Sequence, residues 1–378
     1  MVYYIRFLKT PRIQKQKAGL PIVSALICIT TDLGDAFLAQ DVDLLVSLIA
    51  SRTERVLYQE PLKWKAGKRE LPISMGPFPA HLSQQTIILN VAATNSDKPG
   101  PPTPNRLLGK PGVPLVLSCW SAPFGGSESL VADKLVERRF GPIETLDLRI
   151  WEETGNSIAR HIWDAAIASV IYLQRIVAGD RVGTAPPLQD LLQGQRSTPL
   201  HVIELGSGCG IVGIALAQLL PQCTVLLTDL PEVEEIVTQN VASAKQVPSS
   251  SAVQFRTLDW DEKPPDNLLD GSIDLILVSD CTYNADSLPS LVSMLHQLVQ
   301  MAPDAIVLVA LKRRHESETV FFDLMHSARL STLHQDSIHL PSQHNEMDGI
   351  ELGESCSFLI QRTSVLILLA PSFGVHRD

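Results

Sequence analysis

Hydrophobic and polar residues follow two different patterns along this chain of 378 residues. Before about residue 135, short apolar runs typical of β-strands are separated by stretches rich in proline, glycine and serine. Three such runs are Ala25–Thr31, Thr86–Val91 and Val113–Ser118. The segment Asp97–Pro104 contains four prolines, which exclude regular structure there. This part of the pattern predicts a small, β-rich, loop-rich module over residues 1–135.

From residue 136 onward, the pattern changes to alternating strands and helices. Residues 156–177 carry apolar side chains at helical spacing and predict one long helix, and residues 179–199 form a linker. The strands that follow are expected at Val202–Leu205, Thr224–Asp229, Val253–Leu258, Ile273–Ser279 and Ala305–Leu311. The helices between and after them are expected at Ile211–Leu220, Val233–Ala244, Ser287–Met301 and Glu316–Ala328. Nearly continuous apolar strands separated by helices are typical of a parallel sheet covered on both faces.

Two more strands, at Thr332–Leu340 and Ser355–Gln361, complete this sheet as a hairpin-like pair. The chain is therefore expected to have an α/β fold. A Rossmann-like, seven-stranded, mostly parallel sheet with helices on both faces occupies residues 136–362, beside the smaller N-terminal β-rich module. Residues 363–378 form a C-terminal tail that matches no element.

The composition limits the kinds of partner and the cellular compartment that we expect for this protein. The formal net charge of -10 argues against a general nucleic-acid binder and suits a basic partner, such as a lysine-bearing protein. The six cysteines form no CxxC pair, as in reduced cytosolic or nuclear proteins, and no apolar run is long enough to span a membrane. Histidine spacings fit no zinc site, so no metal is expected. We expect a monomer in the cytoplasm, with the nucleus as the alternative.

The first twenty residues carry five basic side chains and no acidic one. This bias is compatible with a mitochondrial presequence. The alternative is a basic N-terminal strand or arm. We favour the strand or arm, because no serine-rich amphipathic helix follows.

A glycine-rich turn is expected directly after the strand Val202–Leu205. Gly208, Gly210 and Gly213 satisfy the G-x-G-x-x-G pattern, and Asp229 follows about 20 residues later. Taken alone, this pattern admits either a nicotinamide dinucleotide or S-adenosylmethionine. Glu204, two residues before Gly206, favours S-adenosylmethionine, because an acid suits a cationic sulfonium and a diphosphate gains nothing from added negative charge.

Five short segments resemble, in order, the seven-strand protein-lysine methyltransferases of family 16. They are Ile162–Ile167, Glu204–Gly210, Thr228–Leu230, Leu258–Trp260 and Asp280–Tyr283, and the resemblance covers Phe140 to Arg362. The family includes enzymes that act on valosin-containing protein, Hsp70-type chaperones and translation elongation factors. The resemblance implies an S-adenosylmethionine-dependent N-methyltransferase whose substrate is a protein lysine.

The resemblance also implies roles for individual residues. The turn would line the methionine and ribose portion of the cofactor, Asp229 would bind the ribose hydroxyls, Trp260 would lie beside the adenine, and Trp163 would close the pocket. For both tryptophans, packing in the core is the alternative. The complete cofactor-binding set expected is Trp163, Glu204, Gly206, Ser207, Gly208, Asp229, Trp260 and Ser279.

Asp280 and Tyr283 are the expected catalytic residues. Methyl transfer needs a neutral amine, whereas a lysine side chain has a pKa of about 10.4 in water. Asp280 would orient the incoming ammonium, and Tyr283 would form an aromatic wall beside it. Cys281 and Thr282 are interpreted as fillers. The alternative is an acid that caps a turn, with Tyr283 packed beside it.

Two other functions remain open, a small-molecule N-methyltransferase of the nicotinamide type and a non-catalytic cofactor-binding scaffold. The N-terminal module is expected to help select a protein substrate. The basic segment Lys312–His315 is expected to face solvent.

Overall fold

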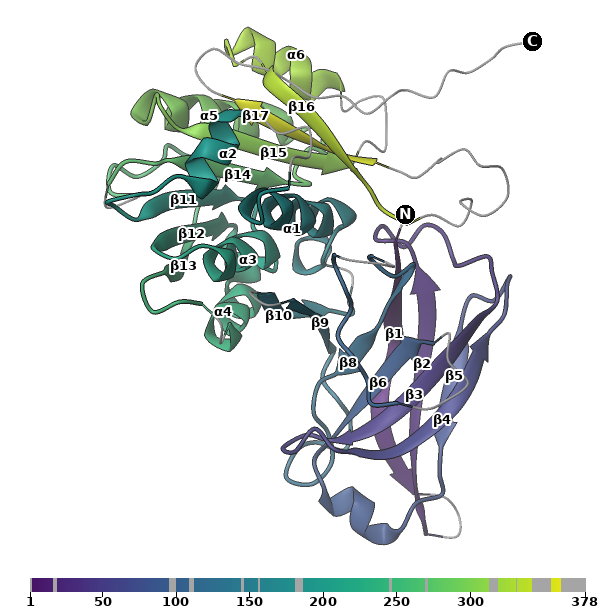
Figure 1. The fold of residues 1–378 in the computed structure, drawn as a ribbon. Coiled ribbons are helices and arrows are strands. Elements are labelled where there is room, and N and C mark those ends of the chain that lie inside the picture. Colours follow the sequence, from purple (N-terminus) through teal and green to yellow (C-terminus); the bar gives the residue numbers. More distant parts are fainter. Residues whose placement is uncertain are drawn as a thin grey trace, which may run out of the picture. The chain divides into compact units, whose positions relative to one another are not determined.

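The computed structural model describes residues 2–15, 19–94, 100–108, 112–143, 146–155, 157–180, 186–244, 247–268, 271–312, 319–330, 332–341 and 355–361. The chain divides into two compact units, the first ending at His161 and the second beginning at Ile162. Figure 1 shows strands throughout the first unit and a sheet covered by helices in the second.

The first unit is a β-sandwich. Its four-stranded sheet has the order β5-β2-β1-β7, and its six-stranded sheet has the order β10-β9-β8-β6-β3-β4. Side chains from both sheets, among them Ile5, Ile27, Leu44 and Leu89, form one buried cluster. The strands of the smaller sheet are β1 (Tyr3–Lys15), β2 (Pro21–Thr30), β5 (Leu71–Met75) and β7 (Val116–Leu117). Those of the larger are β3 (Val42–Ala50), β4 (Val56–Trp64), β6 (Ile87–Ala93), β8 (Cys119–Ser121), β9 (Leu135–Ile143) and β10 (Leu146–Glu153).

This unit is larger and more regular than the predicted loop-rich module. The basic N-terminal segment is strand β1, and β9 and β10 extend the unit beyond the expected boundary at residue 135. The reason is backbone pairing, since β9 bonds to β8 at Trp120↔Glu137 and Ser121↔Val136. The division between the units therefore falls after His161.

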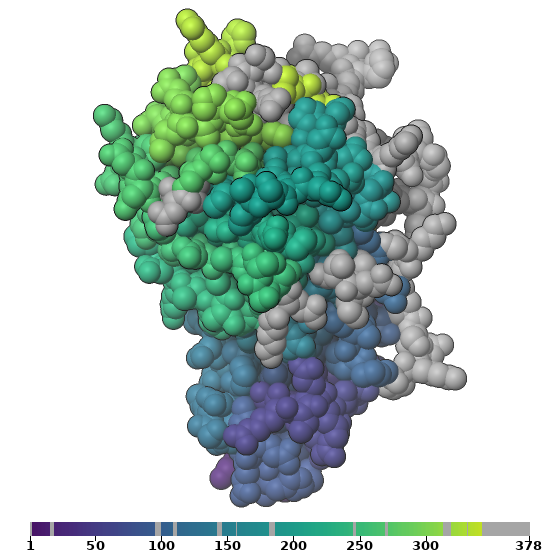
Figure 2. Space-filling view, turned by 60° about the vertical axis from the view of Figure 1, so that its left-hand side comes forward, coloured from purple at the N-terminus to yellow at the C-terminus, as the bar shows by residue number. Residues whose placement is uncertain are grey.

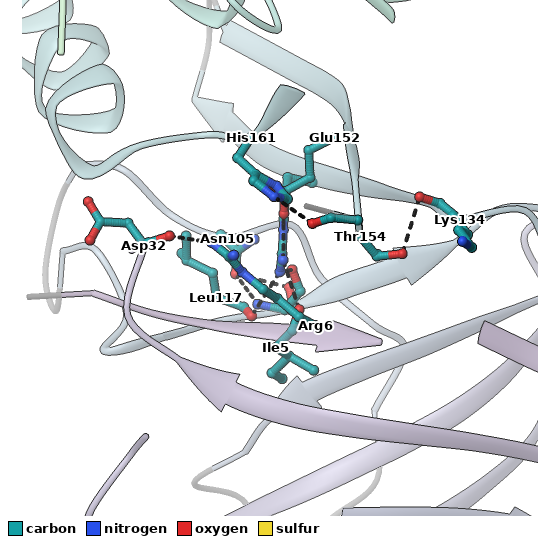
Figure 3. A network of polar contacts seen from close by, with 12 residues as sticks. Ile5, Arg6, Asp32, Asn105, Leu117, Lys134, Glu152, Thr154 and His161 are labelled. Atoms are coloured by element: carbon teal, nitrogen blue, oxygen red, sulfur yellow. Dashed lines mark hydrogen bonds and ion pairs between the residues drawn. The ribbon is translucent and has the colours of Figure 1, made fainter. Parts of the chain in front are cut away.

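A buried ion pair ties the sandwich together. Arg138, fully buried, donates from Nε to Glu152 Oε1 (2.7 Å) and from Nη2 to the Ile5 carbonyl (2.8 Å). Burial alone would raise the pKa of Glu152, but Arg138 outweighs it and holds that pKa well below its usual range. Figure 3 shows Ile5, Leu117 and Glu152 converging on this network, with Arg6 and His161 beside it. The charged residues inside these strands are thus part of the core.

The second unit contains the seven-stranded sheet expected from the sequence. Its strand order is β13-β12-β11-β14-β15-β17-β16, and the first five strands are parallel. Strand β17 is antiparallel to both neighbours, which confirms the predicted terminal pair. The bounds are β11 (Leu200–Leu205), β12 (Cys223–Asp229), β13 (Ala252–Thr257), β14 (Leu275–Ser279), β15 (Ile306–Lys312), β16 (Thr332–His339) and β17 (Ser355–Gln361). The tail at 363–378 lies outside the described residues.

Helices cover this sheet, and α1 packs against α3 while α5 packs against α6. Their bounds are α1 (Asp164–Val177), α2 (Pro186–Gln193), α3 (Ile211–Leu219), α4 (Glu234–Ser243), α5 (Leu288–Met301) and α6 (Thr319–Ser327). The outer surface of this unit is the teal and green part of Figure 2. None of the helices in the described ranges is long and apolar enough to cross a membrane.

Two local predictions were wrong. The long helix expected over 156–177 begins only at Asp164, because Trp163 has extended backbone and a short 3-10 turn, η2 (Ile158–Arg160), precedes it. The expected linker over 179–199 contains helix α2, whose Leu188 and Leu192 are buried.

Candidate active site

The candidate site lies where two strands distant in sequence become neighbours. β11 and β14 pair in parallel, and their last registered pair is Leu205↔Val278. β12 lies on the other side of β11, so the strand order reverses here. Open α/β sheets bind ligands at such a point, beyond the carboxyl ends of the strands. The glycine turn, Asp229 and the segment Asp280–Tyr283 all follow these three ends.

The glycine turn has the backbone that its sequence demands. Gly206, Gly208 and Gly210 adopt φ values of 65°, 53° and 78°, a left-handed region that side chains disfavour. The Ser207 N–H donates to the Thr228 carbonyl (3.0 Å), which fixes the turn to β12. Ser207 Oγ is buried and has no hydrogen-bond partner among the described residues. A buried hydroxyl with no partner is costly, so a ligand that bonds it would relieve that cost.

Gly206 lies between two side chains from other elements. A Cβ on Gly206 would be 2.5 Å from Cys281 Sγ and 3.1 Å from Trp260 Cζ2. The first distance is too short for a real contact and the second is tight, and the left-handed φ also disfavours a side chain, so glycine is favoured here. Trp260 is half-buried after β13 and lies beside the turn, and its contact with the adenine stays a prediction.

Asp229, at the end of β12, accepts two backbone hydrogen bonds. Gly208 N–H donates to Oδ2 (2.8 Å) and Leu230 N–H to Oδ1 (2.7 Å). Burial raises the pKa of Asp229 and the two donors oppose that rise. Each carboxylate oxygen keeps a further lone pair, so the group can also accept hydrogen bonds from a diol.

Glu204 has a different position from the one its charge suggested. It is 1% exposed, and its Oε2 accepts the Gly213 N–H (2.8 Å) in the first turn of α3. Burial raises the pKa of Glu204 to about 8; the Gly213 bond opposes the rise and the charge of Asp229 adds to it. Burial therefore favours the protonated form of Glu204, and the Gly213 bond holds α3 to β11.

Asp280 and Tyr283 follow β14, the strand that pairs with β11. Asp280 is buried with a left-handed φ of 57°, and its N–H donates to the Ala310 carbonyl on β15 (2.8 Å). Tyr283 is 55% exposed. An aromatic ring that open to solvent does not fit the alternative in which Tyr283 only packs beside a turn. The buried carboxylate and the exposed ring suit an entering side chain.

Ser279 and Trp163 have partners on or near α1. Ser279 Oγ lies 3.3 Å from Ser169 Oγ, which itself donates to the Ala165 carbonyl (2.7 Å), so Ser279 is the donor of this pair. Trp163 precedes α1, where its carbonyl accepts the N–H groups of Ala166 and Ile167. A cofactor contact by either residue stays a prediction.

Sequence reasoning did not identify two residues that support the site. Asn240, fully buried on α4, donates from Nδ2 to the Cys209 carbonyl in the glycine turn (2.9 Å). The sequence could have indicated Asn240 as a polar residue four positions after Ile236, on the buried face of that helix. Cys281, interpreted as a filler, lies directly against Gly206.

Lys312 does not face solvent as predicted. It is 5% exposed, and its Nζ lies 2.9 Å from Oδ2 of the fully buried Asp164. The pair links the end of β15 to the start of α1. Residues 313–315 lie outside the described ranges.

A cavity of about 550 Å³ lies at the opposite edge of the sheet. Leu200 and Gln222, at the starts of β11 and β12, line it together with the ends of α1, α2 and α3. It is therefore separate from the candidate site. In the part of the chain that the structure describes, no cluster of three or more His, Cys, Asp or Glu is arranged to hold a metal ion.

Comparison with known proteins gives a consistent picture. The sequence pattern of the lysine methyltransferase family matches residues 143–328. A UPF0665 family protein of Schizosaccharomyces pombe is 28% identical over 335 residues, covering 84% of this chain and 91% of that protein. Protein N-lysine methyltransferase METTL21A of Danio rerio is 31% identical, covering 50% and 75%. EEF1A lysine methyltransferase 3 of Xenopus tropicalis is 30% identical, covering 51% and 76%.

Proposed function

Because the chain belongs to the lysine methyltransferase family and is an S-adenosylmethionine-dependent methyltransferase, we propose that it methylates a lysine side chain of another protein through the site described above. One observation supports the assignment of this activity to the candidate site. The register Leu205↔Val278 puts the glycine turn and Asp280 at adjacent strand ends, so a cofactor on the turn and an amine at Asp280 would be neighbours.

The residues at the turn fit the cofactor. The unpartnered Ser207 hydroxyl and the left-handed backbone of Gly206 and Gly208 would hold its methionine and ribose portion. Asp229 would accept the two ribose hydroxyls at its remaining lone pairs, and Trp260 would lie beside the adenine. When bound, S-adenosylmethionine supplies a methyl group activated by a sulfonium.

The acceptor side is supplied by Asp280 and Tyr283. The carboxylate of Asp280 attracts the lysine ammonium and orients it, while the half-exposed ring of Tyr283 forms one wall and favours a cation over its face. Dehydration of the amine at this position would lower its pKa, the charge of Asp280 would oppose that fall, and the proton would leave to solvent. The bound cofactor would supply the methyl group to the nitrogen lone pair and keep the sulfur as a neutral thioether, while Asp280 and Tyr283 would hold the amine in place. Much of the rate comes from alignment.

The acceptor protein is proposed to be a translation factor or a chaperone-type protein in the cytoplasm. A relative named as an EEF1A lysine methyltransferase supports the first class. A small amine of the nicotinamide type is the second candidate, favoured by no residue described here. A non-catalytic scaffold is disfavoured by the pairing of a buried Asp280 with an exposed Tyr283.

Asp280→Asn tests the catalytic assignment. Asparagine tolerates the left-handed backbone at this position, so the variant removes the charge and keeps the fold. We expect methyl transfer from labelled cofactor into a protein lysate to fall at least a hundredfold, with cofactor affinity by calorimetry within about threefold. Asp286→Asn, at an exposed acid of the same loop, is the matched control. Full activity of the Asp280 variant would show that the catalytic assignment is wrong.

The acceptor class is tested by hydrolysing the labelled lysate proteins to amino acids. Label in methyllysine supports the proposal, and label only in small metabolites contradicts it. Comparing the methyllysine proteome of cells with and without the protein then identifies the substrate.

A further inference from the structure

Cys281 occupies a position between the cofactor turn and the acceptor segment. Its thiol is 6% exposed, and Sγ lies 3.5 Å from the Leu205 carbonyl, 3.6 Å from that of Gly206 and 3.4 Å from that of Ser279. Two of these oxygens belong to the end of β11 and the third to the end of β14. One side chain therefore contacts both strand ends.

These contacts lie at and just past the last paired residues of β11 and β14. The backbone register of β11 and β14 ends at Leu205↔Val278, so the turn and Asp280 both follow the last paired residues. Cys281 Sγ continues the connection across this gap. It fills the space that a Cβ on Gly206 would need, since the two would be 2.5 Å apart.

The next residue of the turn, Ser207, carries a buried hydroxyl. Ser207 is 7% exposed, and its Oγ has no partner among the described residues. The backbone that Cys281 supports is therefore the backbone that presents this free hydroxyl. A shift of the turn would move the methyl donor relative to Asp280.

We infer that Cys281 is a positioning residue, which keeps the cofactor turn and the segment Asp280–Tyr283 in register during methyl transfer. This inference rests on the proposed function. Burial raises the pKa of Cys281 well above its ordinary value, so the group remains a thiol and a hydrogen-bond donor. Displacing reacting groups by about 1 Å can cost up to about a hundredfold in rate, so a small loosening here has a large effect.

Cys281→Ala and Cys281→Ser test the inference in the full-length protein. With Cys281→Ala we expect methyl transfer at saturating cofactor to fall about tenfold, while the cofactor Kd changes less than about threefold. Cys281→Ser keeps a donor at the same carbonyls and is expected to restore the rate to within about twofold. Cys223→Ala is the control for cavity formation, because Cys223 is equally buried but starts β12 at the opposite edge.

The readouts are the rate of label transfer from S-adenosylmethionine into lysate protein, the calorimetric Kd and the thermal midpoint. The inference is overturned if Cys281→Ala lowers only the thermal midpoint, as Cys223→Ala should, or if serine fails to restore the rate. Label from the wild-type protein that appears outside lysine refutes the proposed acceptor alone, because the rate ratios still test Cys281. Absence of any transfer by the wild-type protein would refute both.

Discussion

Replacing Glu204 by glutamine removes an ionisable group from the core while keeping an oxygen that can accept the Gly213 N–H. Glu204 is 1% exposed, and burial raises its pKa to about 8 from an ordinary value of 4.5. Between these two pH values the folded protein keeps a proton that the unfolded chain releases. The stability contributed by this proton is complete below pH 4.5 and is lost as the pH rises toward 8.

The size of this effect follows from the two pKa values. Each pKa unit corresponds to about 1.4 kcal/mol, so the wild-type protein should lose about 3 kcal/mol through this group between about pH 5 and about pH 8. Glutamine has no proton to release. The difference in free energy of unfolding, variant minus wild type, should therefore shift by about 3 kcal/mol in favour of the variant over the same range.

Denaturant titrations at several pH values, without cofactor, measure this difference. Far-ultraviolet circular dichroism is a suitable signal, because α1 to α6, the described α-helices, all belong to the second unit. Glu232→Gln, at an exposed glutamate before α4, is the control for removing one carboxyl group from the surface. A flat difference for Glu204→Gln would show that the buried carboxyl is ionised, and the reasoning from burial would be refuted.

Three further predictions concern packing and domain structure. Gly213→Ala should destabilise the second unit by about 1–3 kcal/mol in the same titration, because its Cβ would lie 2.4 Å from Leu227 Cδ2; an unchanged midpoint would contradict this. Lys312→Met leaves buried Asp164 without this cation and should cost about 3 kcal/mol, most of it recovered in the double variant with Asp164→Leu. Removing residues 1–161 should leave calorimetric cofactor binding intact and reduce label transfer to the physiological substrate; equal transfer would show that the first unit does not select it.

The sheet of the second unit was predictable because its central strands are buried on both faces. Strands β11, β12, β14 and β15 are nearly continuous apolar runs, which distinguishes them from the amphipathic helices between them. The sandwich was harder to predict. β4 is an edge strand that contains Pro61, and β9 contains Arg138, whose charge is neutralised only by a partner on β10.

The sequence predicted which residues belong to the site, but it did not predict which of them contact one another. A turn that needs left-handed backbone requires glycine, so Gly206 and Gly208 are visible in the sequence. The contact of Cys281 with Gly206 joins positions 75 residues apart through two neighbouring strands, and no local pattern encodes it. The raised pKa of Glu204 could not be predicted from the sequence, because it depends on burial, which only the fold determines.

The hairpin β9–β10 has a consequence for recombining this protein with its relatives. The match to the lysine methyltransferase family begins at residue 143, within β9, so β10 lies inside the matched region but pairs within the sandwich. A chimera joined at the family boundary would separate two hydrogen-bonded strands and expose the edge of a sheet. A graft of the sandwich therefore keeps both strands together only when its junction lies at His161 and not at residue 143.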